Sequence, residues 1–159
     1  MILFAFILIL AFSIGRYFDL SALSLHSGCA PIGFLYPLAH ASFFHLSFNL
    51  LAILSFWSAI PQWRRATTVA SLLLTFPVVT YVGMLDKPTV GASGIACGLI
   101  GSYICYIMAE HRRLFAQTAL PILLVIIIQS VLFHDSINWR IHLSALVLSF
   151  LCSLIMTRR

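Results

Sequence analysis

Charge is scarce in this chain: only 8% of its 159 residues are Asp, Glu, Lys or Arg, whereas 62% are hydrophobic. A water-soluble domain carries about 25% charged residues, because its surface must face water. The mean hydropathy of +1.07 therefore excludes a water-covered surface and makes lipid the main solvent of the folded chain. The length suits one membrane-embedded bundle, so we expect residues 1–159 to form a single domain with no separate soluble domain.

The sequence also lacks the patterns of several other protein classes. Its nine Lys and Arg residues occur mostly as short pairs between apolar runs and form no basic stripe, so a nucleic-acid partner is not expected. The four cysteines contain no CxxC pair. We interpret Cys97, Cys105 and Cys152 as buried thiols, because they lie inside apolar runs. The sequence has no internal repeat and no low-complexity tract.

Six apolar runs are candidate transmembrane helices, which need about 20 residues each. They cover residues 1–18, 44–60, 66–85, 91–109, 114–133 and 141–157. The runs show no strict apolar/polar alternation, and a helix satisfies its own backbone in lipid, so the expected fold class is an all-α, six-helix polytopic membrane bundle. The first run is interpreted as a retained helix, because its positive charge, Arg16, follows the apolar segment instead of preceding it; a cleaved signal peptide is the alternative. Pro77 and Pro121 fall inside the third and fifth runs and predict kinks.

Basic residues predict the orientation of the bundle. With six spans, both termini share one side with the loops that follow the second and fourth spans. That side carries six basic residues, which are Arg64, Arg65, Arg112, Arg113, Arg158 and Arg159. The other side carries three, which are Arg16, Lys87 and Arg140. Because basic loops stay in the cytoplasm, we expect both termini there. The separate expectation for localisation is an integral protein of the bacterial inner (plasma) membrane.

Polar side chains inside membrane spans are costly, and they mark functional sites. Here they gather at the starts of three runs: His40, His45 and Asn49 at the second, Gly91, Ser93 and Gly94 at the fourth, and His142 at the sixth. Even-numbered spans all run in the same direction, so these three starts lie at one membrane face. Segments far apart in the sequence are thereby brought to one depth, as a catalytic site requires.

Each group has a chemical role available. A serine hydroxyl such as that of Ser93 becomes nucleophilic when a base takes its proton, and the imidazole of His142 can be that base. His45 and Asn49 are spaced i, i+4 on one helix face and can both donate to a developing oxyanion. The N-terminus of a helix at Ser93 favours negative charge as well. No carboxylate lies within the spans near His142, which favours a Ser–His dyad over a triad.

Taken singly, each residue has a simpler interpretation. Ser93 alone is a common packing residue of membrane helices, and His142 alone can be an interfacial histidine. His40 and His45 could pair on a metal, but an i, i+5 spacing on one helix would face them apart, so no metal site is expected. Gly94 and Gly98 form a GxxxG pattern, which predicts close packing of the fourth span, with small residues of the sixth as its partners.

The combination resembles one known family. HxxxxHxxxN over residues 40–49, GxSG over 91–94 and a histidine in the last span are similar to the motifs of the rhomboid intramembrane serine proteases. The resemblance covers the chain from the first loop to the C-terminus. It implies a six-helix rhomboid-like bundle that cleaves transmembrane protein substrates at or just below the membrane surface, with substrate entry gated by the fifth helix. No metal or cofactor is implied.

The resemblance also implies a role for each matched residue. Ser93 corresponds to the nucleophile and His142 to the general base, whereas His45 and Asn49, together with the Ser93 backbone N–H, correspond to the oxyanion-stabilising donors. The three residues that correspond to structural support are His40, Gly91 and Gly94.

Three departures from the family pattern leave alternatives open. Residues 31–34 replace a Trp-Arg pair of the first loop, Cys97 replaces an aromatic residue, and Ala145 and Ser149 replace glycines of the last span. One alternative is a compact member of the rhombosortase type, which acts on proteins with a C-terminal sorting tail. Another is a catalytically inactive rhomboid-like binder or chaperone of transmembrane helices. A small transporter or channel is a third, disfavoured because no charged residue lies in the middle of a span.

Overall fold

The protein is described here from a computed structural model, which covers residues 1–15, 23–28, 32–132 and 137–157. Within these residues the chain forms six α-helices and one 3-10 helix: α1 (Ile2–Gly15), η2 (Ile32–Leu38), α2 (Phe43–Ala59), α3 (Gln62–Met84), α4 (Ser93–Glu110), α5 (Arg112–Leu132) and α6 (Trp139–Thr157). Several residues used in the sequence analysis lie outside the described residues: Arg16, Pro31, Arg158 and Arg159.

The all-α fold predicted from the apolar runs is confirmed. Four helices, α3 to α6, are long and apolar enough to cross a membrane, and α1 and α2 are shorter apolar helices. Their bounds agree with the predicted runs to within a few residues, and the start of α3 lies four residues earlier, at Gln62. Pro77 and Pro121 lie inside α3 and α5, as predicted.

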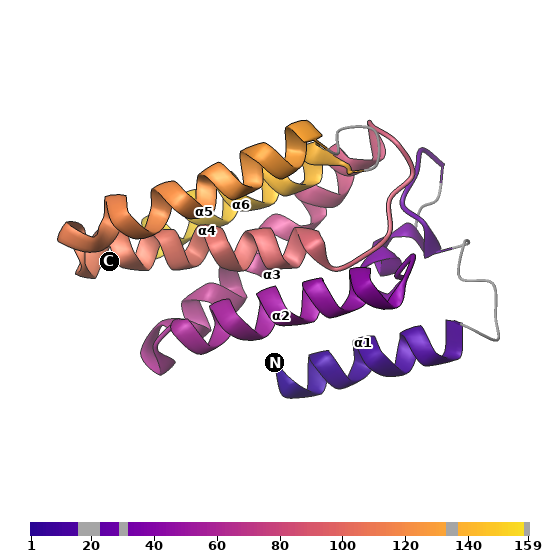
Figure 1. The fold of residues 1–159 in the computed structure, drawn as a ribbon, viewed down its shortest axis with the longest axis horizontal. Coiled ribbons are helices and arrows are strands. Elements are labelled where there is room, and N and C mark those ends of the chain that lie inside the picture. The colour runs from indigo at the N-terminus through magenta and orange to yellow at the C-terminus, as the bar shows by residue number, and fades with distance from the viewer. Residues whose placement is uncertain (16–22, 29–31, 133–136, 158–159) are drawn as a thin grey trace.

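The helices lie side by side along the long axis of the molecule, with α1 at one edge and α5 toward the opposite edge (Figure 1). The centre of the bundle is α4, which packs against α2, α3, α5 and α6. Its closest neighbour is α6, because α4 presents glycines to it. A Cβ atom at Gly98 would lie 3.0 Å from the hydroxyl of Ser149, and one at Gly101 would collide with the backbone oxygen of Leu146. The close packing predicted from GxxxG is therefore found.

Hydrogen bonds between small polar side chains hold the interfaces of α6. The Ser71 hydroxyl donates to the backbone oxygen of Ser149 at 3.0 Å, and the hydroxyls of Thr75 and Ser149 lie 3.2 Å apart. Nearer the C-terminus, the hydroxyls of Ser102 and Ser153 lie 2.9 Å apart. These groups are buried, and in lipid they have no water to bind, so their pairing stabilises one arrangement of α3, α4 and α6.

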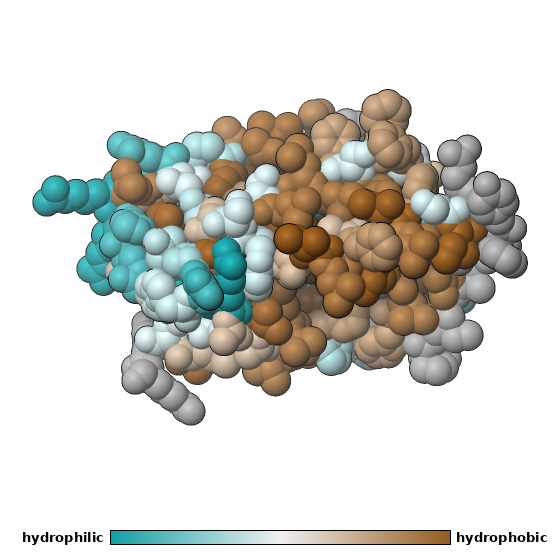
Figure 2. Space-filling view, turned by 90° about the horizontal axis from the view of Figure 1, so that it is seen from below, coloured by the Kyte–Doolittle hydropathy of each residue, from teal (hydrophilic) through white to brown (hydrophobic). Residues whose placement is uncertain are grey.

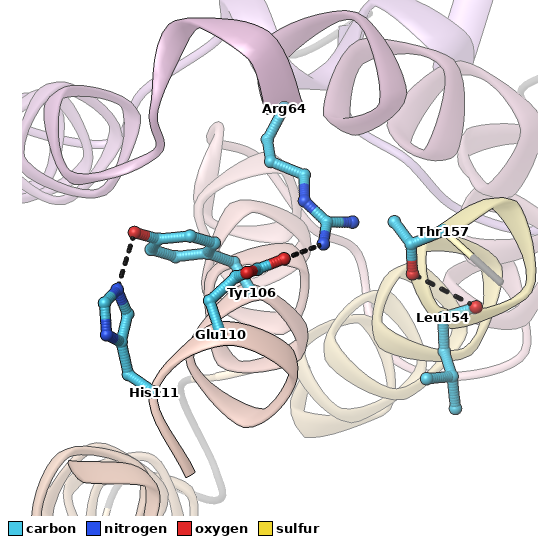
Figure 3. Close-up of polar contacts among 6 residues, drawn as sticks. All are labelled: Arg64, Tyr106, Glu110, His111, Leu154 and Thr157. Atoms are coloured by element: carbon cyan, nitrogen blue, oxygen red, sulfur yellow. Dashed lines mark hydrogen bonds and ion pairs between the residues drawn. The ribbon is translucent and has the colours of Figure 1, made fainter. Parts of the chain in front are cut away.

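One end of the bundle is basic and hydrophilic. In Figure 2, which views the α1 side, hydrophilic residues gather at this end and hydrophobic residues cover most of the remaining surface. Arg64, at the start of α3, forms an ion pair of 2.7 Å with Glu110, at the end of α4 (Figure 3). Beside it, the Tyr106 hydroxyl lies 3.0 Å from Nε2 of His111. The 18 residues of α4 separate this end from Ser93 by roughly 26 Å, at 1.5 Å per residue.

Candidate active site

Three helix starts build the site, at the end of the bundle away from the basic cluster. Ser42 caps α2, and its hydroxyl accepts a hydrogen bond of 3.1 Å from the backbone N–H of His45. Ser93 is the first residue of α4, and His142 lies in the first turn of α6. As predicted from the direction of the even-numbered spans, α2, α4 and α6 all begin at this end (Figure 1).

The hydroxyl of Ser93 and the imidazole of His142 are in contact. Their Oγ and Nε2 atoms lie 2.8 Å apart, within hydrogen-bond distance. His142 is buried, with 8% of its surface exposed. At this distance the ring nitrogen can accept the hydroxyl proton, which is the geometry that a serine nucleophile and its base require.

Donors lie beside this pair on α2. Asn49 is buried, and its Nδ2 atom has no hydrogen-bond partner within the described residues. Gly91 lies close to both predicted donors: a Cβ atom there would be 2.6 Å from the ring of His45 and 3.2 Å from Nδ2 of Asn49. A buried amide donor without a partner is costly, and here it lies next to the segment that leads into Ser93.

Gly91 and Gly94 have separate structural reasons to be glycine. Gly91 has a φ of +108°, which side-chain-bearing residues rarely adopt. Gly94 is helical, but a Cβ atom there would lie 2.7 Å from the side chain of Ile141 and 3.0 Å from the hydroxyl of Tyr36. The two glycines predicted to flank Ser93 therefore let the side chains of His45 and Ile141 come close to the backbone on either side of it.

The predicted separation of His40 and His45 is wrong. Their ring centroids lie 5.2 Å apart, edge to face, because His40 precedes α2, which begins at Phe43. Nε2 of His40 accepts a hydrogen bond of 3.4 Å from the backbone N–H of Ala92, which ties the first loop to the residue before Ser93. Burial, with the nearby His45 as a second cause, lowers the pKa of His40 to about 4. The neutral ring can therefore remain an acceptor at neutral pH.

A cavity of about 720 Å³ opens beside the Ser–His pair. Residues of α2, α4 and α5 line it, together with His142 of α6: Phe48, Asn49, Ala52, Phe56, Ser93, Ala96, Cys97, Ile100, Pro121, Ile122, Val125, Ile126, Gln129 and His142. Most of the lining is apolar, and its polar side chains are those of Asn49, Ser93, Gln129 and His142. Such a cavity can receive an extended apolar segment and present a backbone carbonyl to the hydroxyl.

Within the described part of the chain, no group of three or more His, Cys, Asp or Glu side chains is placed to hold a metal ion. Cys97 and Cys105 are buried, as interpreted from the sequence, but the same interpretation is wrong for Cys152, which is only partly buried. Cys97 also lines the cavity, one helical turn after Ser93.

Sequence reasoning missed three residues near the site. Gln129 of α5 lines the cavity. The one feature of the sequence that marks it is a polar side chain inside an apolar run. Tyr36 is 1% exposed, and its backbone oxygen accepts a hydrogen bond of 3.0 Å from the N–H of Gly91. Asn138 is buried four residues before His142. Asparagine at a helix start is a capping signal, but its further partners are far away in the sequence.

Comparison with known proteins identifies the family of the chain. The family model of the rhomboid domain matches residues 33–159. The chain is also 33% identical over 130 residues to the protein named "Putative rhomboid protease YdcA" of Bacillus subtilis (strain 168). That alignment covers 72% of this chain and 63% of the relative, so this chain spans less than two thirds of the relative's length. On the extent of the family match and this identity, the chain belongs to the rhomboid family.

Proposed function

We propose that this chain is an intramembrane serine endopeptidase that cleaves transmembrane segments of other membrane proteins near the extracytoplasmic surface. The single observation that carries the proposal is the distance of 2.8 Å between Oγ of Ser93 and Nε2 of His142, at the wall of an apolar cavity. Membership of the rhomboid family supports an activity of this class. We treat residues 1–159 as one membrane domain that carries the whole site.

The reaction begins with proton transfer from Ser93 to His142. As the proton leaves, the Ser93 oxygen attacks the carbonyl carbon of the scissile peptide and forms a tetrahedral intermediate. His142 then gives the proton to the departing amine, and the peptide bond breaks to leave an acyl-enzyme. Water, deprotonated by His142, then attacks the ester carbonyl. The bond to the Ser93 oxygen breaks, this oxygen takes the proton back from His142, and the second product leaves with a new carboxyl group.

The oxyanion of the intermediate needs donors that are already in place. The partnerless Nδ2–H of Asn49, a ring N–H of His45 and the backbone N–H of Ser93 are assigned this role. His40 supports them by holding Ala92, and Gly91 and Gly94 allow the close approach of their neighbours. The donors come from α2 and α4, whereas the base comes from α6, so the site depends on the relative positions of three helices.

The substrate reaches this site from the bilayer between α2 and α5. Both helices line the cavity, and α5 packs mainly against α4. Only 6% of the apolar window of α5 is buried, so α5 can move away from α2 with little loss of protein contacts. A transmembrane helix that unwinds between them would place an extended stretch beside Ser93.

The test is cleavage of a reporter membrane protein by the purified chain in detergent or liposomes. Ser93→Ala and His142→Ala should each lower kcat by a factor of about 10³ or more, because they remove the nucleophile or its base. Asn49→Ala should lower kcat by about 10²- to 10³-fold, as loss of one oxyanion donor does. Ser144→Ala is the matched control, because Ser144 is also on α6 but donates only to the backbone oxygen of Ile141.

Equal cleavage by the wild type and Ser93→Ala would refute the dyad. Binding of transmembrane helices without cleavage, and without labelling of Ser93 by a fluorophosphonate, would instead identify a non-catalytic binder. Substrates with and without a C-terminal sorting tail, compared at equal concentration, separate the general rhomboid specificity from the rhombosortase type.

We further propose that the site faces the outside of a bacterial inner membrane, with both termini in the cytoplasm. Among the described residues, Arg64, Arg65, Arg112 and Arg113 lie toward the end of the bundle opposite the site, whereas Lys87 and Arg140 lie toward the site. This distribution favours the cytoplasm for the basic end. A green fluorescent protein fused to the C-terminus should fluoresce, and an alkaline phosphatase fusion at the same place should be inactive. The reverse pattern would overturn the orientation.

A further inference from the structure

Asn138 links three segments of the chain at the start of α6. Its side-chain Nδ2 atom donates to the backbone oxygen of Gly83 at 3.1 Å and to Oγ1 of Thr89 at 2.9 Å, with a longer contact of 3.4 Å to the oxygen of Lys87. Its Oδ1 atom accepts from the backbone N–H of Ile141 at 3.3 Å. The residue is 4% exposed, and its amide uses both hydrogens and the carbonyl oxygen inside the protein.

The partners of Asn138 lie on the path to the nucleophile. Gly83 is in the last turn of α3, and Thr89 lies in the segment between α3 and Ser93. Thr89 is held from its other side as well. Its backbone N–H and oxygen pair with the oxygen and N–H of Leu25, in the first loop, at 2.9 Å and 2.8 Å. The segment before Ser93 is thereby fixed between the first loop and the start of α6.

The spacing along the chain makes this link relevant to the site. Thr89 precedes Ser93 by four residues, and Asn138 precedes His142 by four residues. The bond of 2.9 Å between Asn138 and Thr89 therefore joins the two catalytic helices just before their reactive side chains. Further along these helices, the packing of Gly98 against Ser149 fixes their separation. The amide fixes the ends where the hydroxyl and the imidazole must meet.

We propose that Asn138 is a positioning residue that sets the alignment of Ser93 and His142 through its donor hydrogen bonds. This inference rests on the proposed protease function. Misplacement of a reacting group by about 1 Å can cost about a hundredfold in rate, so a loosened link would reduce kcat even in a folded protein. KM would change little, because Asn138 is not among the residues that line the cavity.

The competing interpretation is that Asn138 merely caps α6 through Oδ1. The substitution Asn138→Asp separates the two roles. An ionised carboxylate still accepts from the N–H of Ile141 and is a good helix cap. It cannot donate, however, and it would repel the backbone oxygens of Gly83 and Lys87. When protonated, the same carboxyl regains one O–H donor in nearly the same shape as the amide.

The two roles therefore predict opposite responses to pH. We would measure kcat and KM of the wild type and Asn138→Asp on the reporter substrate from about pH 5 to about pH 8, where a buried carboxyl ionises. If Asn138 positions the dyad, the ratio of the variant's kcat to that of the wild type falls by tenfold or more as pH rises. KM stays within about threefold over this range, because substrate contacts are unchanged. For a helix cap alone, the kcat ratio is constant or rises with pH, and that result overturns the inference.

Two further variants keep the test informative if Asn138→Asp folds poorly. Thr89→Val removes one acceptor of the amide with little change in volume, and it should lower both kcat and the rate of Ser93 labelling by a fluorophosphonate. Ser102→Ala is the matched control, because it removes a buried hydroxyl contact of α4 and α6 at the far end of the bundle. Ser102→Ala should lower thermal stability by about as much as Thr89→Val does, but it should leave kcat unchanged.

The failure of this inference can be told apart from the failure of the proposed function. A wild type whose Ser93 is not labelled and does not cleave refutes both. A labelled, active wild type whose kcat is unaffected by Asn138→Asp at every pH and by Thr89→Val refutes the positioning role alone.

Discussion

Replacement of Gly91 by alanine tests the close approach beside the nucleophile. Gly91 has a φ of +108°. A residue with a side chain in this conformation would lower the free energy of unfolding by about 1–3 kcal/mol. The added Cβ atom would also lie 2.6 Å from Cε1 and Nε2 of His45. A contact this short forces a shift, and overpacking of this kind costs about 1–3 kcal/mol more. We expect Gly91→Ala to lose about 2–6 kcal/mol of unfolding free energy.

Gly28 supplies the control for backbone strain. Its φ is +89°, but a Cβ atom there would meet nothing within 4 Å. Gly28→Ala should therefore lose only the backbone contribution of about 1–3 kcal/mol. The unfolding free energies of both variants would be measured by denaturant titration in detergent micelles.

A double-mutant cycle isolates the collision itself. His45→Ala removes the ring that the new Cβ atom would strike, so the loss caused by Gly91→Ala should shrink by about 1 kcal/mol or more in that background. Equal losses for Gly91→Ala and Gly28→Ala, together with additive effects in the cycle, would show that the ring and the glycine do not constrain each other.

Three other predictions concern stability. Glu110→Gln should cost no more than about 1 kcal/mol of unfolding free energy in a denaturant titration, because the carboxylate that pairs with Arg64 is 41% exposed; a loss several times larger would contradict this. Ser102→Ala and Ser153→Ala should show a coupling of about 0.6–2 kcal/mol in a double-mutant cycle, the range for hydrogen bonds between membrane helices; strict additivity would argue against their contact. Burial lowers the pKa of His40 from 6.5 to about 4, so the folded state binds fewer protons than the unfolded state between these values. Stability should therefore fall as pH drops from 6.5 to 4. In thermal unfolding, His40→Asn should weaken this dependence on pH. The same pH profile in the variant and the wild type would show that His40 is not its source.

The sequence was sufficient for the features that depend on local pattern and chain direction. Apolar runs located the helices, because a membrane helix needs a long stretch without charge. Alternation of direction then placed the starts of α2, α4 and α6 at one face. That reasoning predicted the meeting of Ser93 and His142, although neither residue type is diagnostic alone.

The sequence was insufficient where contacts depend on irregular backbone. The contact between His40 and His45 was missed because helical spacing was applied to a residue that precedes the helix. Part of the segment between the first two spans forms η2, and Tyr36 from this helix stacks on Phe76 of α3 with ring centroids 6.1 Å apart. Such contacts arise from the packing of the first loop against α3, which no local periodicity encodes.

Asn138 shows the same limit for hydrogen bonds. Sequence reasoning missed this residue, and the only signal that its position carries is that of a helix cap, a local role. Its donor partners lie 49 and 55 residues earlier in the chain. Only the assembled bundle brings these acceptors to one amide.

The outer position of α5 ties the behaviour of the cavity to the surrounding lipid. Only 6% of its apolar window is buried, compared with 61% for α4. Acyl chains are as apolar as leucine, so a sideways displacement of α5 exchanges one apolar neighbour for another without a hydrophobic penalty. Changes in bilayer thickness or in acyl-chain order therefore act directly on α5, which lines part of the cavity. The hydroxyl and the imidazole come instead from α4 and α6, which pack closely against each other through Gly98 and Gly101.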